Sequence, residues 1–118
     1  DLKVVSVESG VGWIPFVMEA LLYEMAENAP QDLKKLSLTP LEYFQRQIYA
    51  TTWFERADIA YAVQRLGEDH IMFETDFPHP TCLYPEPLKN AADNLAGLSS
   101  TAREKILSRN AKLLYRLV

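Results

Sequence analysis

The feature that most constrains the fold is the alternation of strand-type and helix-type segments along the chain. Three short runs rich in β-branched and aromatic residues predict strands, at residues 3–8, 47–54 and 70–75. Helical periodicity follows each run, at residues 14–27 with a short turn at 40–45, at 56–66, and at 87–95 and 102–117. Strands that alternate with helices form parallel β/α units joined by right-handed crossovers. The sequence therefore predicts an α/β fold with a parallel sheet.

The last predicted helix carries two local signals. The capping box Thr101-Ala-Arg-Glu104 is expected to open it. Asn110 lies on the apolar stripe of this helix and is expected to be a buried amide that bonds backbone groups. His70 precedes its strand, so we expect a structural or exposed histidine at the opposite end of the sheet from any active site.

Three strands are few for a complete sheet, because the outer strands would be unprotected edges. The chain is therefore expected to associate or to belong to a larger barrel. It opens almost directly into a strand and has no initiator methionine. We expect residues 1–118 to be part of a single domain that is incomplete on its own.

Composition excludes several classes of protein. With 48% hydrophobic and 24% charged residues, the chain is typical of a soluble globular protein. A net charge of -4 without a basic stripe argues against nucleic acid as a partner. The longest apolar stretch, residues 11–18, is far short of the roughly 20 residues of a membrane span. The single Cys82 agrees with a reducing, cytoplasmic compartment.

Each of the three predicted strands ends in an acidic residue. These residues are Glu8, Glu55 and Asp76, and strand alternation places Glu74 on the same face as Asp76. In parallel β/α proteins the active residues gather at the carboxyl ends of the strands. The alternative is that these acids are solvated or cap the helices that follow, which is the favoured interpretation for Glu55.

The segment Asp76-Phe-Pro-His79 adds a second ligand-type residue in a stiff loop. Asp76 and His79 alone make only a partial metal site, because catalytic zinc normally takes three protein ligands. Ser9 does not fit a nucleophile elbow, since position 7 is valine. Cys82 has no basic neighbour in sequence to activate its thiol.

Aromatic residues flank the strand ends and are candidates to line a substrate pocket. The candidates for substrate binding are Trp13, Tyr49, Phe77 and Tyr84. The alternative is that they pack helices on strands, which is favoured for Trp53.

Two motifs in combination resemble a known family. IMFETDFPHP at residues 71–80 and REKILSRNAKLLYRL at residues 103–117 resemble the carboxyl-terminal end of the amidohydrolase superfamily. The similarity is to its metal-dependent hydrolases and decarboxylases, typified by aminocarboxymuconate semialdehyde decarboxylase. The opening LKVVSVESGVGWIP looks like the sixth-strand region of that family, and QIYATTWFE like the seventh.

The resemblance implies the last three β/α units of a TIM (β/α)8 barrel, with a divalent metal ion at the strand ends. Asp76 would bind the metal or handle the proton of metal-bound water, with Glu8 as a second ligand and His79 as a neighbouring catalytic contact. Zinc is the expected ion, and the oxygen ligand Glu8, where the family commonly has histidine, favours manganese or magnesium as alternatives. Glu74 adds negative charge that its own protonation or a cationic partner would balance.

The family's His-x-His of the first strand and its fifth-strand histidine are not in this segment. The parent reaction is expected to be hydrolysis or non-oxidative decarboxylation of a small organic acid or aromatic compound. We expect the isolated 118 residues to be inactive, with a homo-oligomer or a missing amino-terminal barrel half completing the sheet. The alternative function is a non-catalytic module, without metal, that forms oligomers or binds a small molecule.

Overall fold

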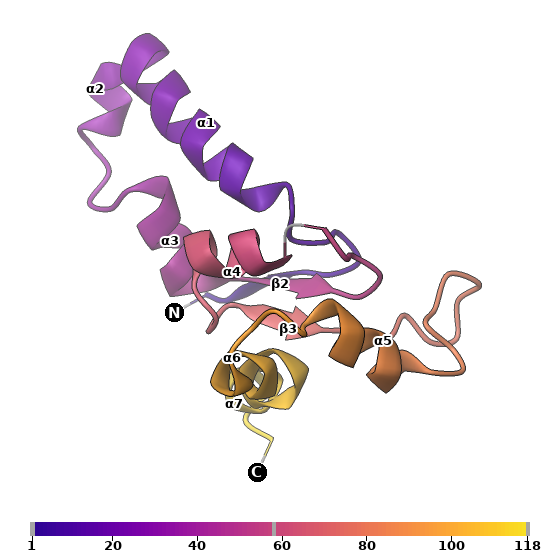
Figure 1. Ribbon diagram of the computed structural model, residues 1–118. Coiled ribbons are helices and arrows are strands. Elements are labelled where there is room, and N and C mark those ends of the chain that lie inside the picture. Colours follow the sequence, from indigo (N-terminus) through magenta and orange to yellow (C-terminus); the bar gives the residue numbers. More distant parts are fainter. Residues whose placement is uncertain (1, 58, 118) are drawn as a thin grey trace.

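The computed structural model describes residues 2–57 and 59–117 and contains one parallel sheet with helices packed on it (Figure 1). The strands are β1 (Val4–Ser6), β2 (Ile48–Thr52) and β3 (Ile71–Phe73). The helices are α1 (Ile14–Asn28), α2 (Pro30–Leu33), α3 (Pro40–Gln47), α4 (Ile59–Leu66), α5 (Pro87–Asn94), α6 (Ser100–Glu104), the π-helical turn η1 (Lys105–Arg109) and α7 (Asn110–Tyr115). The predicted alternation of strands and helices is confirmed.

The sheet order is β1-β2-β3, and both strand pairs are parallel. The register places Ser6 beside Ala50 and Ala50 beside Ile71. Because all strands run in one direction, their carboxyl ends meet at a single edge of the sheet. Each strand is shorter than predicted, because the ladder ends at Ser6, Thr52 and Phe73, two residues before the end of each predicted strand.

The core lies between the sheet and the helices on its faces. Figure 1 shows α3 and α4 above the sheet, and α6 and α7 beside β3 on the other side. The buried apolar residues of this core are Val11, Ile14, Phe44, Ala50, Ile59, Ala62, Leu66, Ile71, Leu95 and Ile106. Helix α1 runs away from the sheet, and only its first residues, Ile14 and Pro15, are buried.

The last helix begins differently from the prediction. Its N-cap is Ser99, whose hydroxyl accepts a hydrogen bond from the backbone N–H of Ala102 at 3.1 Å. The predicted capping box at Thr101 is wrong, because Ser99 is extended and Thr101 is already helical. A capping box is present instead at α3, where Thr39 and Glu42 bond each other's backbone N–H groups.

Two predicted structural roles are confirmed. The Asn110 amide is 3% exposed and donates hydrogen bonds to the carbonyls of Glu68 and Ile71. His70 lies at the amino end of β3, where its Nδ1 is 2.9 Å from the Ile48 carbonyl and its ring lies 4.7 Å from that of Tyr49. Among the described residues, no helix is long and apolar enough to cross a membrane.

Candidate metal centre

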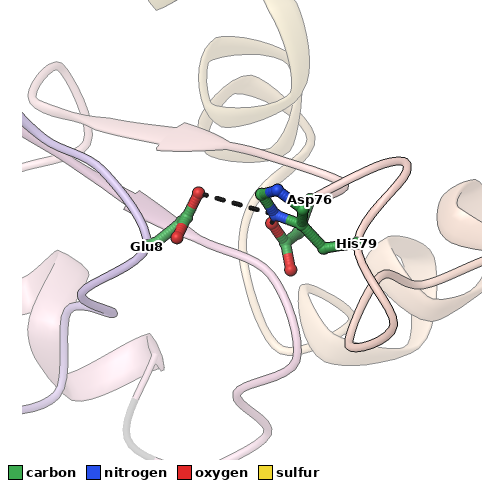
Figure 2. Close-up of side chains that lie close together, drawn as sticks. All are labelled: Glu8, Asp76 and His79. Carbon is green, nitrogen blue, oxygen red and sulfur yellow. Dashed lines mark hydrogen bonds and ion pairs between the residues drawn. The ribbon is translucent and has the colours of Figure 1, made fainter.

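Three predicted site residues come together at the carboxyl edge of the sheet (Figure 2). Glu8 lies in the β1–α1 turn, residues 7–13, while Asp76 and His79 lie in the loop after β3. One ligand atom from each of the three lies within 4.8 Å of the others. We refer to Glu8, Asp76 and His79 as the acid–histidine cluster.

Asp76 is the least exposed member of the cluster, with a side chain that is 4% exposed. Its Oδ2 accepts a hydrogen bond from the Thr81 hydroxyl at 2.6 Å, and its Oδ1 lies 2.6 Å from Nδ1 of His79. These two bonds, first Thr81 and then His79, hold the pKa of Asp76 below its ordinary value. The backbone φ of Asp76 is +60°, a left-handed conformation closed by the bond from His79 N–H to the Asp76 carbonyl at 2.9 Å.

His79 is exposed and faces both acids. Its side chain is 61% exposed, and Nδ1 lies 3.9 Å from Oε1 of Glu8. The hydrogen bond to Asp76 is the main cause of a raised His79 pKa, and the negative charges of Asp76 and Glu8 act in the same direction. An imidazole beside two carboxylates can share a proton with them or join them as a ligand.

Glu8 approaches Asp76 and His79 from the other side of the cluster (Figure 2). Its φ is +56°, and its backbone N–H faces Oε1 of Glu74 at 3.0 Å and the Thr51 hydroxyl at 3.2 Å. Two carboxylates and an imidazole are a donor set that manganese and zinc both accept. The residues of the cluster therefore fit a divalent cation.

The two remaining acids at this edge have different contacts. Glu74 is partly buried, and burial is the main cause of its raised pKa, with the nearby charges of Glu8 and Asp76 adding to the effect. Glu55 was expected to be solvated or to cap the helix after it. Instead its Oε1 accepts hydrogen bonds from the backbone N–H groups of Val11 and Gly12, in the β1–α1 turn.

The predicted substrate-binding aromatics do not all lie near the cluster. The rings of Phe77 and Tyr84 lie 6.3 Å apart in the loop that carries Asp76, and both are exposed. The Trp13 indole donates hydrogen bonds to the Ser9 and Gly10 carbonyls of the turn that carries Glu8. Tyr49 lies against His70 at the amino end of the sheet, so the structure does not bring it to the cluster.

Two hydroxyl groups contribute to the site and are not among the predicted residues. Thr81 binds Asp76, and Thr51 in β2 lies between the Ser6 carbonyl and the Glu8 N–H. Thr81 lies in the same loop as Asp76, five residues on, and that proximity is the only sequence signal for it. Thr51 belongs to another strand, and only sheet register brings it to Glu8.

Comparisons with known proteins identify the family of the chain. The family model described as Amidohydrolase matches residues 1–117. No protein of curated function matches the sequence.

Solved structures of enzymes from this family are similar to the chain over almost its whole length. A 5-carboxyvanillate decarboxylase from Sphingomonas paucimobilis is 28% identical with a TM-score of 0.75, and the match covers 99% of this chain and 34% of that one. An amidohydrolase from Mycobacterium avium subsp. paratuberculosis is 26% identical with a TM-score of 0.75, covering 96% and 28%. A dihydroxybenzoic acid decarboxylase from Polaromonas with bound manganese is 27% identical with a TM-score of 0.68, covering 98% and 34%.

The chain thus spans about a third of the length of the decarboxylases that it matches. The family model covers all but its last residue, and the two sequence motifs that suggested the resemblance lie within that match. The chain belongs to the amidohydrolase family.

Proposed function

We propose that the acid–histidine cluster is part of the divalent-metal site of an amidohydrolase-type enzyme. The reaction would be hydrolysis or non-oxidative decarboxylation of a small organic acid or aromatic compound. The observation that carries this proposal is the convergence of Glu8, Asp76 and His79 within 4.8 Å at the carboxyl ends of parallel strands. The manganese in the Polaromonas decarboxylase supports the choice of a divalent ion.

The chain's own residues would have distinct roles in such a site. Asp76 keeps its carboxylate ionised because Thr81 and His79 both stabilise the charge, so it is the strongest candidate ligand. Glu8 would supply the second carboxylate oxygen, and His79 would either bind the ion or exchange a proton with substrate through its imidazole. A divalent ion held there supplies Lewis-acid polarisation of a bound substrate oxygen. Phe77 and Tyr84, in the same loop, are candidates to contact an aromatic ring of the substrate.

The parallel β/α units would form the last three units of a (β/α)8 barrel of about 250 residues. Two observations support this proposal: all three strands are parallel and consecutive, and the chain spans only 34% of the 5-carboxyvanillate decarboxylase. Residues outside the described segment would then complete the ligand set and the substrate pocket. The isolated chain would lack catalytic activity for the same reason.

A second candidate function is a non-catalytic module that associates through the edge of β1. Val4 and Val7, at this edge, are 47% and 55% exposed, and within the described residues β1 pairs only with β2. An open strand edge with exposed apolar side chains favours pairing with another chain. This candidate predicts an oligomer that binds no metal ion.

Titration of the metal-free 118-residue chain with Mn²⁺ or Zn²⁺, followed by calorimetry, tests the proposal. We expect one ion to bind per chain, no binding in Asp76→Ala, and weaker binding in Glu8→Ala. Asp93→Ala, an exposed acid in α5, is the matched control and should leave binding unchanged. Binding that is equally tight in Asp76→Ala would refute the role of Asp76 as a ligand, and a wild-type chain that binds neither ion would favour the non-catalytic module. Sedimentation of the same samples then tests the oligomer.

A further inference from the structure

Two acidic side chains at the same edge, Glu55 and Glu74, lie outside the acid–histidine cluster. Glu74 follows β3 and accepts a hydrogen bond from the Glu8 N–H at 3.0 Å. Glu55 follows β2 and accepts from the N–H groups of Val11 at 2.8 Å and Gly12 at 3.2 Å. Both carboxylates therefore bind the backbone of the β1–α1 turn, one at its start and the other near its end.

The start of this turn has a conformation that needs support. Glu8 has a φ of +56°, and the left-handed region costs a residue other than glycine roughly 1–2 kcal/mol. Such a conformation persists where the surrounding structure fixes it. The Glu8 side chain is 55% exposed, so packing does little to orient it. The position of its carboxylate therefore depends on its backbone, whose N–H donates a hydrogen bond to Glu74 at 3.0 Å and a longer one to the Thr51 hydroxyl at 3.2 Å.

The end of the turn is shaped around the Glu55 carboxylate. Gly10 has a φ of +68°, and a Cβ atom placed there would lie 2.6 Å from Oε1 of Glu55. The turn thus passes closer to the carboxylate than a side chain at this position would allow. Within the described residues, Oε2 of Glu55 is buried without a hydrogen-bond partner, which is costly for a carboxylate. The two N–H bonds to Oε1 are charge-assisted and are the contacts that offset this cost.

We propose that Glu74 and Glu55 are positioning residues that hold the β1–α1 turn by its backbone N–H groups and so place the Glu8 carboxylate beside Asp76 and His79. The acids at the strand ends thereby divide into two kinds. Glu8 and Asp76 present oxygens to the cluster, whereas Glu55 and Glu74 bind the turn. This inference rests on the proposed metal site, because the placement of Glu8 matters for function when Glu8 binds the ion.

Alanine and glutamine variants of the two residues separate positioning from charge. Glutamine keeps an acceptor oxygen and removes the negative charge, while alanine removes both. Two quantities would be measured on the 118-residue chain: hydrogen exchange of the Glu8, Val11 and Gly12 amides by NMR, and the Kd of Mn²⁺ by calorimetry. The Gly67 amide, bonded to the Val63 carbonyl in α4, serves as an internal reference for global unfolding. Glu27→Ala, an exposed acid of α1, is the control variant.

The positioning role predicts faster exchange of the Glu8 amide in Glu74→Ala, and of the Val11 and Gly12 amides in Glu55→Ala, with Gly67 unchanged. Mn²⁺ binding should weaken about tenfold in both alanine variants, as is usual for residues that orient ligands, and should recover in the glutamine variants. Equal losses with glutamine and alanine would mean that charge rather than the hydrogen bond matters, which overturns the proposal.

Failure of the metal site and failure of the positioning role give different results. If the wild-type chain binds Mn²⁺ and the alanine variants bind it equally well, the positioning role is refuted while the metal site stands. If the wild-type chain binds no Mn²⁺, Glu8, Asp76 and His79 do not hold the ion by themselves, and amide exchange alone decides the positioning role. If the Glu8, Val11 and Gly12 amides then exchange at the wild-type rate in the alanine variants, Glu74 and Glu55 do not position the β1–α1 turn. Faster exchange of these amides supports the positioning role.

Discussion

Asn110 offers a stability test whose magnitude follows from two hydrogen bonds. Its amide is 3% exposed and donates to the Ile71 carbonyl at 2.8 Å and the Glu68 carbonyl at 2.7 Å. The His70 carbonyl bonds Ala50 of β2, and carbonyls alternate in direction along a strand, so the Ile71 carbonyl points away from β2. Asn110 therefore joins α7 to the outer side of β3.

Asn110→Ala removes both bonds and should lower the free energy of unfolding by about 2–4 kcal/mol. The Ile71 bond is buried, and leaving its carbonyl unpaired costs about 1–3 kcal/mol. The Glu68 bond is only partly buried, so water can replace the amide and the loss there is about 1 kcal/mol. Asn110→Asp should destabilise at least as much at neutral pH, because it places a carboxylate against two carbonyl oxygens.

Urea unfolding of the 118-residue chain, followed by circular dichroism, measures this difference. Asn28→Ala is the matched control, because the Asn28 amide bonds Glu24 on the exposed surface of α1. That variant should change the free energy of unfolding by less than about 0.5 kcal/mol. An Asn110→Ala chain within the same limit of the wild type would refute the reasoning that this amide ties the last helix to the sheet.

Three further predictions concern the site edge. Gly10→Ala should lower the free energy of unfolding by about 1–2 kcal/mol in the same urea assay, because the φ of Gly10 is +68° and an added Cβ atom would clash with the Glu55 carboxylate. Gly97→Ala, with no atom within 4 Å of the added Cβ, should be close to neutral, and equal effects of the two would contradict the explanation. An NMR titration of the metal-free chain should give His79 a pKa above its ordinary value of 6.5, returning towards it in Asp76→Asn. Because the pKa of His79 is raised and that of Asp76 is lowered, the pair stabilises the fold at pH values between the two pKa values. This stability is lost as the pH rises through the pKa of His79 or falls through the pKa of Asp76. An unchanged His79 pKa in Asp76→Asn would show that the 2.6 Å contact does not control it.

Much of the fold follows from local patterns. The order of strands and helices could be read from the sequence because side-chain periodicity and β-branched runs are local properties. The boundaries of α1 and α5 agree with the prediction within one residue. The capping box at Thr101 was wrong because a capping motif depends on which residue adopts the extended conformation, and here that residue is Ser99.

The candidate site could be predicted only in part from the sequence. Asp76 and Glu8 follow parallel strands, and His79 lies in the loop with Asp76, so their convergence could be expected from topology. The contacts of Glu55 and Thr51 could not, since both depend on how neighbouring strands are staggered. An acid at the end of a strand looks the same in sequence whether it faces a cation site or a backbone N–H.

The sequence by itself therefore determined the parallel β/α architecture, the family and the acids available at the strand ends. These depend on local periodicity and on short motifs that need no knowledge of distant contacts. Tertiary structure alone decided which acids meet His79 and which bind the β1–α1 turn. The different roles of Glu8 and Glu55 depend on contacts between residues that are more than 40 positions apart in the sequence. Only the packed sheet brings these residues within hydrogen-bonding range.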